Sequence, residues 1–142
     1  MFRQWFARWR RPQSLGRRGE NAAARFLKKQ GYTIVARGRR VGFGELDLVA
    51  VDPRGTSGRT VVFVEVKTRA SLDKGHPAEA VDKAKQQKLT RIALAYLKRH
   101  GLLEYPARFD VVAIVWPAAK KKPTLEHIKN AFEATGEGQM FS

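Results

Sequence analysis

Hydrophobic positions along the chain follow two periods, which together predict a helix, three strands, a second helix and two further strands. The run at 61–69 is rich in Val and is apolar enough to predict a strand covered on both faces, in the middle of a sheet. Apolar positions spaced three or four apart predict helices, and alternation predicts the other strands. The predicted helices are 15–30 and 77–100, and the predicted strands are 32–36, 44–51, 61–69, 108–116 and a short edge strand at 124–128.

Capping residues support both predicted helices. Ser14 is suited to cap the first helix and Gly31 to end it. Pro77 suits the first turn of the second helix, which Gly101 stops. The basic stretch 37–40 is expected to connect the first strand to the second.

Turn-forming residues at 52–59 predict that the second and third strands form an antiparallel hairpin. If the hairpin is symmetric about Thr56, Asp47 lies opposite Glu65. The same register places Glu45 opposite Lys67. Opposed side chains on one face lie about 5 Å apart at Cβ, so this register brings carboxylates together beside an amine.

Two carboxylates about 4 Å apart repel each other by roughly 4 kcal/mol at an effective dielectric near 20, so a positive partner is needed. Converging carboxylate oxygens are the ligands that Mg²⁺ prefers. An Asp followed by Glu-x-Lys is the arrangement of metal-dependent phosphodiester cleavage, in which the lysine orients the attacking water. The alternative is a hairpin with solvated charges, in which Glu65 pairs with Lys67 or Glu45.

Glu20 lies at the edge of the apolar stripe of the first predicted helix, where a carboxylate needs a partner. One interpretation pairs it with Arg17. The other gives it to a cation held by Asp47 and Glu65. Lys85 lies on the flank of the second helix's stripe, where it either reaches substrate or is solvated.

The charge of the chain indicates a polyanionic partner. Lys and Arg number 28 against 13 Asp and Glu, which gives a net charge of +15 and favours nucleic acid first and an acidic membrane surface second. Residues 1–40 hold twelve Lys or Arg and a single acid. Arg37, Arg39 and Arg40 are therefore expected to hold a phosphate backbone beside the acidic strands. The absence of cysteine excludes a disulfide framework and a thiolate zinc site.

The length predicts one domain at 14–132, preceded by a basic aromatic tail at 1–13 and followed by a C-terminal tail at 133–142. The first tail is suited to lie on a membrane surface, to stack on nucleic acid or to dock on the domain, and a frayed basic end explains it equally well. No run reaches transmembrane length and the start lacks the apolar core of a secretion signal. We therefore expect a cytoplasmic location without integral membrane association.

Several motifs occur in a fixed order along residues 15–132. They are Gly19-Glu20, Gly44-Glu45-Leu46-Asp47, Val64-Glu65-Val66-Lys67-Thr68-Arg69, Lys85 and Arg108-Phe109-Asp110. Together they resemble the YraN-type predicted endonuclease family. The resemblance implies an α/β, restriction-endonuclease-like fold related to archaeal Holliday junction resolvases, with an αβββαβ core and a mixed sheet flanked by helices. It also implies Glu20, Asp47 and Glu65 as metal ligands and Lys67 as the catalytic lysine.

The leading hypothesis is an endonuclease that uses Mg²⁺, or Mn²⁺ in its place, to hydrolyse DNA, including branched or recombination intermediates. Glu45 and Arg69 are expected beside the ligands, and Lys85 on the nucleic-acid side. Resolvase-like action requires two sites and hence a homodimer. The competing hypothesis is a basic nucleic-acid-binding module that has the same fold but does not cut.

Overall fold

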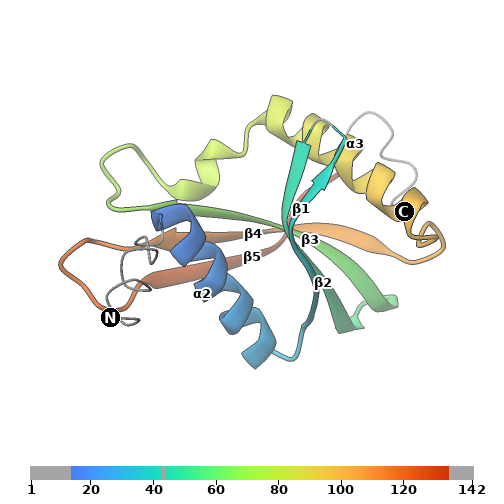
Figure 1. Ribbon diagram of the computed structural model, residues 1–142, viewed down its shortest axis with the longest axis horizontal. Helices are drawn as coiled ribbons and strands as arrows, with labels where there is room; N and C mark the ends of the chain where they lie inside the picture. The colour runs from blue at the N-terminus through green and yellow to red at the C-terminus, as the bar shows by residue number, and fades with distance from the viewer. Residues whose placement is uncertain (1–13, 43, 135–142) are drawn as a thin grey trace, which may run out of the picture.

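The computed structural model describes residues 14–42 and 44–134, which form a five-stranded sheet with helices on both faces (Figure 1). The strand order is β1-β2-β3-β4-β5; β3 and β4 are parallel, and the other neighbours are antiparallel. The predicted mixed α/β sheet and its αβββαβ order are confirmed. The elements are α2 (Leu15–Lys29), β1 (Thr33–Val41), β2 (Gly44–Gly55), β3 (Gly58–Arg69), the 3₁₀ helix η1 (Pro77–Ala80), α3 (Lys83–Arg99), β4 (Ala107–Val115) and β5 (Thr124–Phe132).

The central strand β3 is covered on both faces, as its unbroken apolar sequence predicts. Val62 and Val64 pack with the buried face of α2, whereas Val61 and Phe63 pack with that of α3. A strand directs successive side chains to opposite faces, so each helix receives every second residue. Since both faces are dry, any charged residue on β3 needs a partner at the point where it lies.

The first helix begins and ends where its sequence predicts. Ser14 caps α2 by accepting a hydrogen bond from the Arg17 N–H at 3.2 Å. Gly31 follows the helix with φ +94°, a left-handed conformation that favours glycine. None of the helices in the described part of the chain has the length and hydrophobicity needed to cross a bilayer.

Two predicted connections are parts of strands. Residues 37–40 were expected to form a connector, but they continue β1, where Arg37 pairs with Leu48 and Arg40 with Glu45. The turn predicted at 52–59 is shorter, because β2 continues to Gly55 and β3 begins at Gly58. Edge strands can expose their side chains, so arginines continue β1 without an apolar pattern to mark it.

The predicted helix 77–100 is two elements. The 3₁₀ helix η1 ends at Ala80, and α3 begins only after Asp82, whose carboxylate caps it by accepting the Lys85 N–H at 2.9 Å. This cap fixes where α3 begins, and with it the position on the helix from which the Lys85 side chain extends.

The ends of the domain also differ in part from expectation. The predicted edge strand 124–128 is longer and continues as β5 to Phe132. The predicted tail 1–13, and the predicted C-terminal tail from 135 onward, lie outside the described residues.

Gly19 allows α2 to approach the end of β3 closely. A Cβ atom at this position would lie 1.8 Å from Oγ1 of Thr68. Oγ1 of Thr68 is itself buried, without a hydrogen-bond partner among the described residues. The close approach holds Glu20, the next residue, over the sheet.

We expect Gly19→Ala to lower the free energy of unfolding by about 1–3 kcal/mol, because the added methyl group overpacks the contact with Thr68. Gly16→Ala on the same helix is the matched control. A Cβ there meets nothing within 4 Å, so the better helix propensity of alanine should stabilise the protein by about 0.5–1 kcal/mol. Urea unfolding of both variants measures the difference, and equal effects would contradict the close packing.

Candidate metal and nucleic-acid site

The strands β2 and β3 stop pairing at the point where their acidic residues begin. Their register pairs Val51 with Val61 and continues to Leu48 with Val64, as the symmetric hairpin predicts. Beyond this pair, the carboxylate of Asp47 accepts the backbone N–H of Val66 at 3.0 Å. Where the backbone pairing of β2 with β3 ends, the Asp47 carboxylate therefore serves as the acceptor for a backbone N–H of β3. This hydrogen bond fixes the orientation of Asp47.

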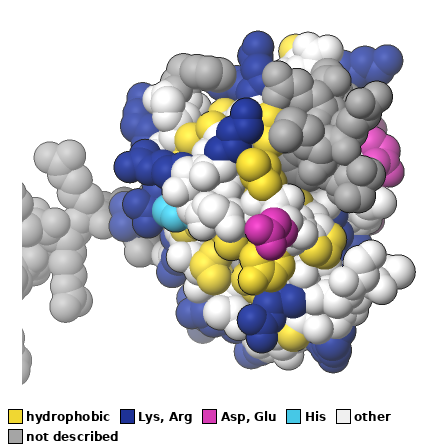
Figure 2. Space-filling model, turned by 90° about the vertical axis from the view of Figure 1, so that its right-hand side faces the viewer, with side chains coloured by type: hydrophobic (Ala, Val, Ile, Leu, Met, Phe, Trp, Pro, Cys, Tyr) yellow, Lys and Arg dark blue, Asp and Glu magenta, His cyan; other side chains and the backbone are white. Residues whose placement is uncertain are grey.

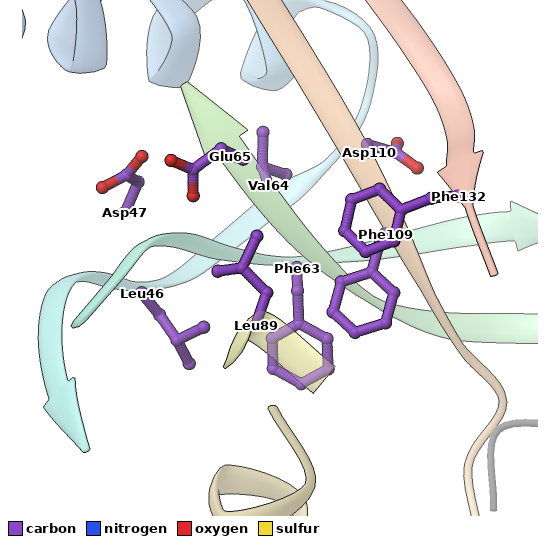
Figure 3. A pocket seen from close by; sticks show the side chains of 9 residues that line it. All are labelled: Leu46, Asp47, Phe63, Val64, Glu65, Leu89, Phe109, Asp110 and Phe132. Carbon is purple, nitrogen blue, oxygen red and sulfur yellow. The ribbon is translucent and has the colours of Figure 1, made fainter. Parts of the chain in front are cut away.

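Asp47 and Glu65 point toward each other at the opening between the two strands (Figure 3). Both line a small cavity whose other lining residues are apolar, Phe63, Leu89 and Phe109 among them, with the exception of Asp110. Glu65 is 9% exposed. The two carboxylates predicted to lie opposite each other are thus neighbours in a poorly hydrated place, where their repulsion is weakly screened.

Glu20 adds a third acid from the second turn of α2. It is half-buried and shares a hydrogen bond with Asp47. Burial raises the pKa of Glu20, and both the charge of Asp47 and this hydrogen bond raise it further. The same hydrogen bond acts in the opposite direction on Asp47, where it lowers the pKa and offsets part of the effect of burial.

Glu65 has the most strongly raised pKa among the three acids. Burial, followed by the charge of Asp47, raises the pKa of Glu65 to about 7. Lys85 opposes this shift, because its Nζ lies 3.2 Å from Oε1 of Glu65. The charge of Lys67 acts in the same direction but less strongly. Burial also raises the pKa of Asp47, and the Val66 N–H and Lys85 offset part of that rise.

The donor chemistry of these acids fits a hard divalent cation, because each offers carboxylate oxygens and together they have too little positive charge nearby. Asp47 interacts with both of the other acids. As the side chains stand, they form two overlapping pairs. Within residues 14–42 and 44–134, no three His, Cys, Asp or Glu side chains converge on a common point.

The remaining predicted site residues lie around this cluster in different ways. Glu45 was expected opposite Lys67, but this is wrong: Glu45 pairs with Arg40 of β1 and is exposed. Its charge still reaches the cluster and raises the pKa of both Glu20 and Asp47. The register beyond Leu48 differs because β2 leaves β3 there.

The predicted phosphate-binding arginines are exposed on the edge strand β1, with Arg37 bonded to Asn21 of α2. They are Arg37, Arg39 and Arg40. Arg69 is half-buried at the end of β3, and its Nε is buried without a hydrogen-bond partner among the described residues. Lys and Arg side chains also dominate the charged surface in Figure 2, where Asp and Glu are sparse.

The ion pair between Lys85 and Glu65 was not foreseen in the sequence, which left Lys85 either reaching substrate or solvated. The lysine lies on the face of α3 that looks toward Glu65 because α3 starts at Lys83 behind the Asp82 cap. The spacing of Lys85 from the apolar residues of α3 was the available signal. This spacing places Lys85 on the flank of the helix, but it does not identify Glu65 as the residue that the flank contacts.

A second group of acids, on β2 and β4, is satisfied internally. Arg108 donates to Asp110 and Asp52, each at 2.9 Å, and to the hydroxyl of Tyr32 at 2.7 Å. Nε2 of His127 lies 2.8 Å from Asp110. Burial alone would raise the pKa of Asp110, but the bonds from His127 and Arg108 lower it. The ion pair of Arg108 with Asp110 is therefore structural.

Comparison with known proteins finds a family rather than a defined activity. The family model described as "Uncharacterised protein family UPF0102" matches residues 19–114, which include Glu20, Asp47, Glu65 and Lys67. A UPF0102 protein of Rhodopirellula baltica is 49% identical over 123 residues, which are 86% of this chain and 72% of that protein. A UPF0102 protein of Prosthecochloris aestuarii is 46% identical over 87% of this chain and 96% of its own length.

Among solved structures, SfsA of Pyrococcus furiosus in complex with Ca²⁺ is similar over 80% of this chain and 63% of that chain. The TM-score is 0.41 and the sequence identity is 13%. This likeness is too loose to carry an argument about fold or function.

We expect Glu65→Gln to stabilise the metal-free protein at pH 8, by on the order of 1–3 kcal/mol, and much less at pH 5. Below a pH of about 4.5 the carboxyl of Glu65 is protonated whether the chain is folded or not. As the pH rises, the unfolded chain loses this proton first, because the folded pKa is about 7, so the folded state becomes less stable between these values. The amide cannot ionise and avoids this loss.

Thermal unfolding at pH 5 and pH 8 in the presence of a chelator measures the effect. Glu104→Gln is the control, since Glu104 is exposed. A Glu65→Gln variant that gains no more stability at pH 8 than at pH 5 would show that the acid is not held in an unfavourable charged state.

Proposed function

The chain belongs to the UPF0102 family, and from that premise we propose that its acidic cluster is the active site of a metal-dependent endonuclease acting on DNA. The observation that carries the proposal is the meeting of Asp47 and Glu65 where β2 leaves β3, with Glu20 bonded to the same Asp47. A structural role alone gives no reason to bring Asp47 and Glu65 together in a poorly hydrated opening and to bond Asp47 to an acid of α2 as well.

Asp47 and Glu65 would hold the cation, with Glu20 as a further ligand or as the group that positions the attacking water. Mg²⁺, or Mn²⁺ in its place, supplies Lewis acidity toward a phosphate when bound. Lys67 projects from the same strand as Glu65, two residues further along, and its charge acts on that acid. Its ammonium group stabilises the negative charge that grows on the phosphate during attack.

The basic surface supports DNA as the substrate class. Arg37, Arg39 and Arg40 are exposed on β1, whose partner strand β2 carries Asp47. Phosphate contacts of this kind set the position of a duplex without reading its sequence. Cleavage of branched DNA would extend the proposal, and the substrate panel below includes it.

A specific observation also favours the non-catalytic alternative. Lys85 already neutralises part of the charge of Glu65, at 3.2 Å. A binding module could keep this ion pair as a permanent substitute for a metal. The two candidates therefore differ in whether cleavage occurs at all.

We expect the purified protein to cut at least one DNA among linear duplex, single strand and four-way junction in the presence of Mg²⁺ or Mn²⁺. Asp47→Asn should abolish cleavage, and Lys67→Ala should reduce the rate by about 10²-fold or more, the usual effect of removing one group that stabilises transition-state charge. Both variants should keep DNA affinity within a few fold. Labelled substrates resolved on denaturing gels, with gel-shift titrations beside them, measure the two properties separately.

Lys122→Ala is the matched control for Lys67→Ala, because Lys122 is an exposed lysine in the loop before β5. It removes the same charge away from the cluster and should leave the cleavage rate unchanged. Binding without cleavage on every substrate and with either ion would support the non-catalytic module instead.

A further inference from the structure

The ion pair between Lys85 and Glu65 joins a helix to the acidic strand at the centre of the candidate site. Nζ of Lys85 lies 3.2 Å from Oε1 of Glu65, within direct contact of a charge-assisted hydrogen bond. The Glu65 side chain is 10% exposed, whereas the Lys85 side chain is 45% exposed. The acid is therefore fixed and enclosed, and the lysine reaches it from the solvent side.

The ammonium group of Lys85 can move while the backbone of this residue stays in place. Its N–H is held by the Asp82 cap at 2.9 Å, at the start of α3. The four-carbon side chain beyond that point is intrinsically flexible, and it is 45% exposed. Moving the ammonium away from Glu65 therefore requires rotation of side-chain bonds, without unfolding of the helix.

Lys67 and Lys85 differ in their relation to Glu65. Lys67 lies on the same strand as the acid, two residues away, and its charge acts on Glu65 less strongly than that of Lys85. An ammonium ion in contact with a carboxylate oxygen and a divalent cation bound to the same oxygen repel each other strongly at this distance. The two cations therefore compete for Glu65.

We propose that Lys85 is a built-in counter-ion that occupies Glu65 in the metal-free protein and leaves it when a divalent cation binds. The inference rests on the proposed function in that it takes Glu65 as a metal ligand. Displacement places a free ammonium group at the mouth of the site, where phosphate would arrive. Lys85 thus opposes metal binding and provides positive charge for the substrate once the metal is bound.

Isothermal titration calorimetry of the full chain with Mn²⁺ alone, at pH 7.5 and without DNA, tests this competition. Lys85→Gln should bind Mn²⁺ about 5-fold more tightly than the wild type, because the fraction of molecules with Glu65 accessible rises when a partly exposed ion pair is removed. Lys85→Ala provides a second truncation with a high helix propensity. Circular dichroism confirms that each variant is folded.

Lys83→Gln is the matched control, because Lys83 is an exposed lysine at the first position of α3, two residues from Lys85 and on a different side of the helix. It removes the same charge and should change the Mn²⁺ affinity by less than about 2-fold, which separates contact with Glu65 from a general charge effect. Equal or weaker Mn²⁺ binding by Lys85→Gln and Lys85→Ala would overturn the inference. Absence of Mn²⁺ binding in all proteins would overturn it as well.

The outcomes distinguish this inference from the proposed function. Tighter Mn²⁺ binding in Lys85→Gln, together with no cleavage of any DNA, would reject the nuclease while the competition stands. Cleavage by the wild type with unchanged Mn²⁺ affinity in Lys85→Gln would reject the competition while the nuclease stands.

Discussion

The separation of β2 from β3 beyond Leu48 and Val64 is the constraint on which the candidate site depends. In a continuous ladder, main-chain groups would satisfy each other and the strands would stay too close for carboxylates to share the gap. Here the Asp47 carboxylate accepts the Val66 N–H, so the opening forms without leaving that backbone group unpaired. The hydrogen bond that stabilises the parted strands also aims an acid at Glu65.

Close packing of α2, and the start of α3, bring the other charged residues of the cluster to the opening. Contact of Gly19 with Thr68 brings α2 near enough for Glu20 to bond Asp47, and the Asp82 cap starts α3 where Lys85 can reach Glu65. The pKa of each of the three acids is raised, because burial and repulsion from a neighbouring acid disfavour the ionised carboxylates. A cost of this kind is typical of sites whose charge is balanced by a ligand rather than by the protein itself.

Residues that act through local pattern could be predicted, and those set by remote packing could not. The turn residues predicted the register of the hairpin as far as Leu48 and Val64, so Asp47 and Glu65 could be expected as neighbours, and the apolar run of β3 marked the central strand. The arginines of β1 carry no strand signal, because an edge strand needs no buried side chains. The partner of Lys85 depends on a helix start six residues later than Pro77 suggests, and the 3₁₀ helix η1, which packs on the sheet, occupies the intervening stretch.

The balance of charge at the site also constrains the order in which partners can bind. A net charge of +15 attracts DNA to the molecule as a whole, but the acids within the opening repel a phosphate that comes close. Lys85 acts on both Asp47 and Glu65, and Lys67 acts on Glu65, so these acids and lysines largely offset each other's charge in the opening. Under the proposed function, the exposed arginines hold DNA at the rim whether or not a metal is present, whereas the scissile phosphate enters only after a divalent cation has reversed the local sign. DNA affinity and cleavage are then governed by different residues, which is why variants of the acids can lose one and keep the other.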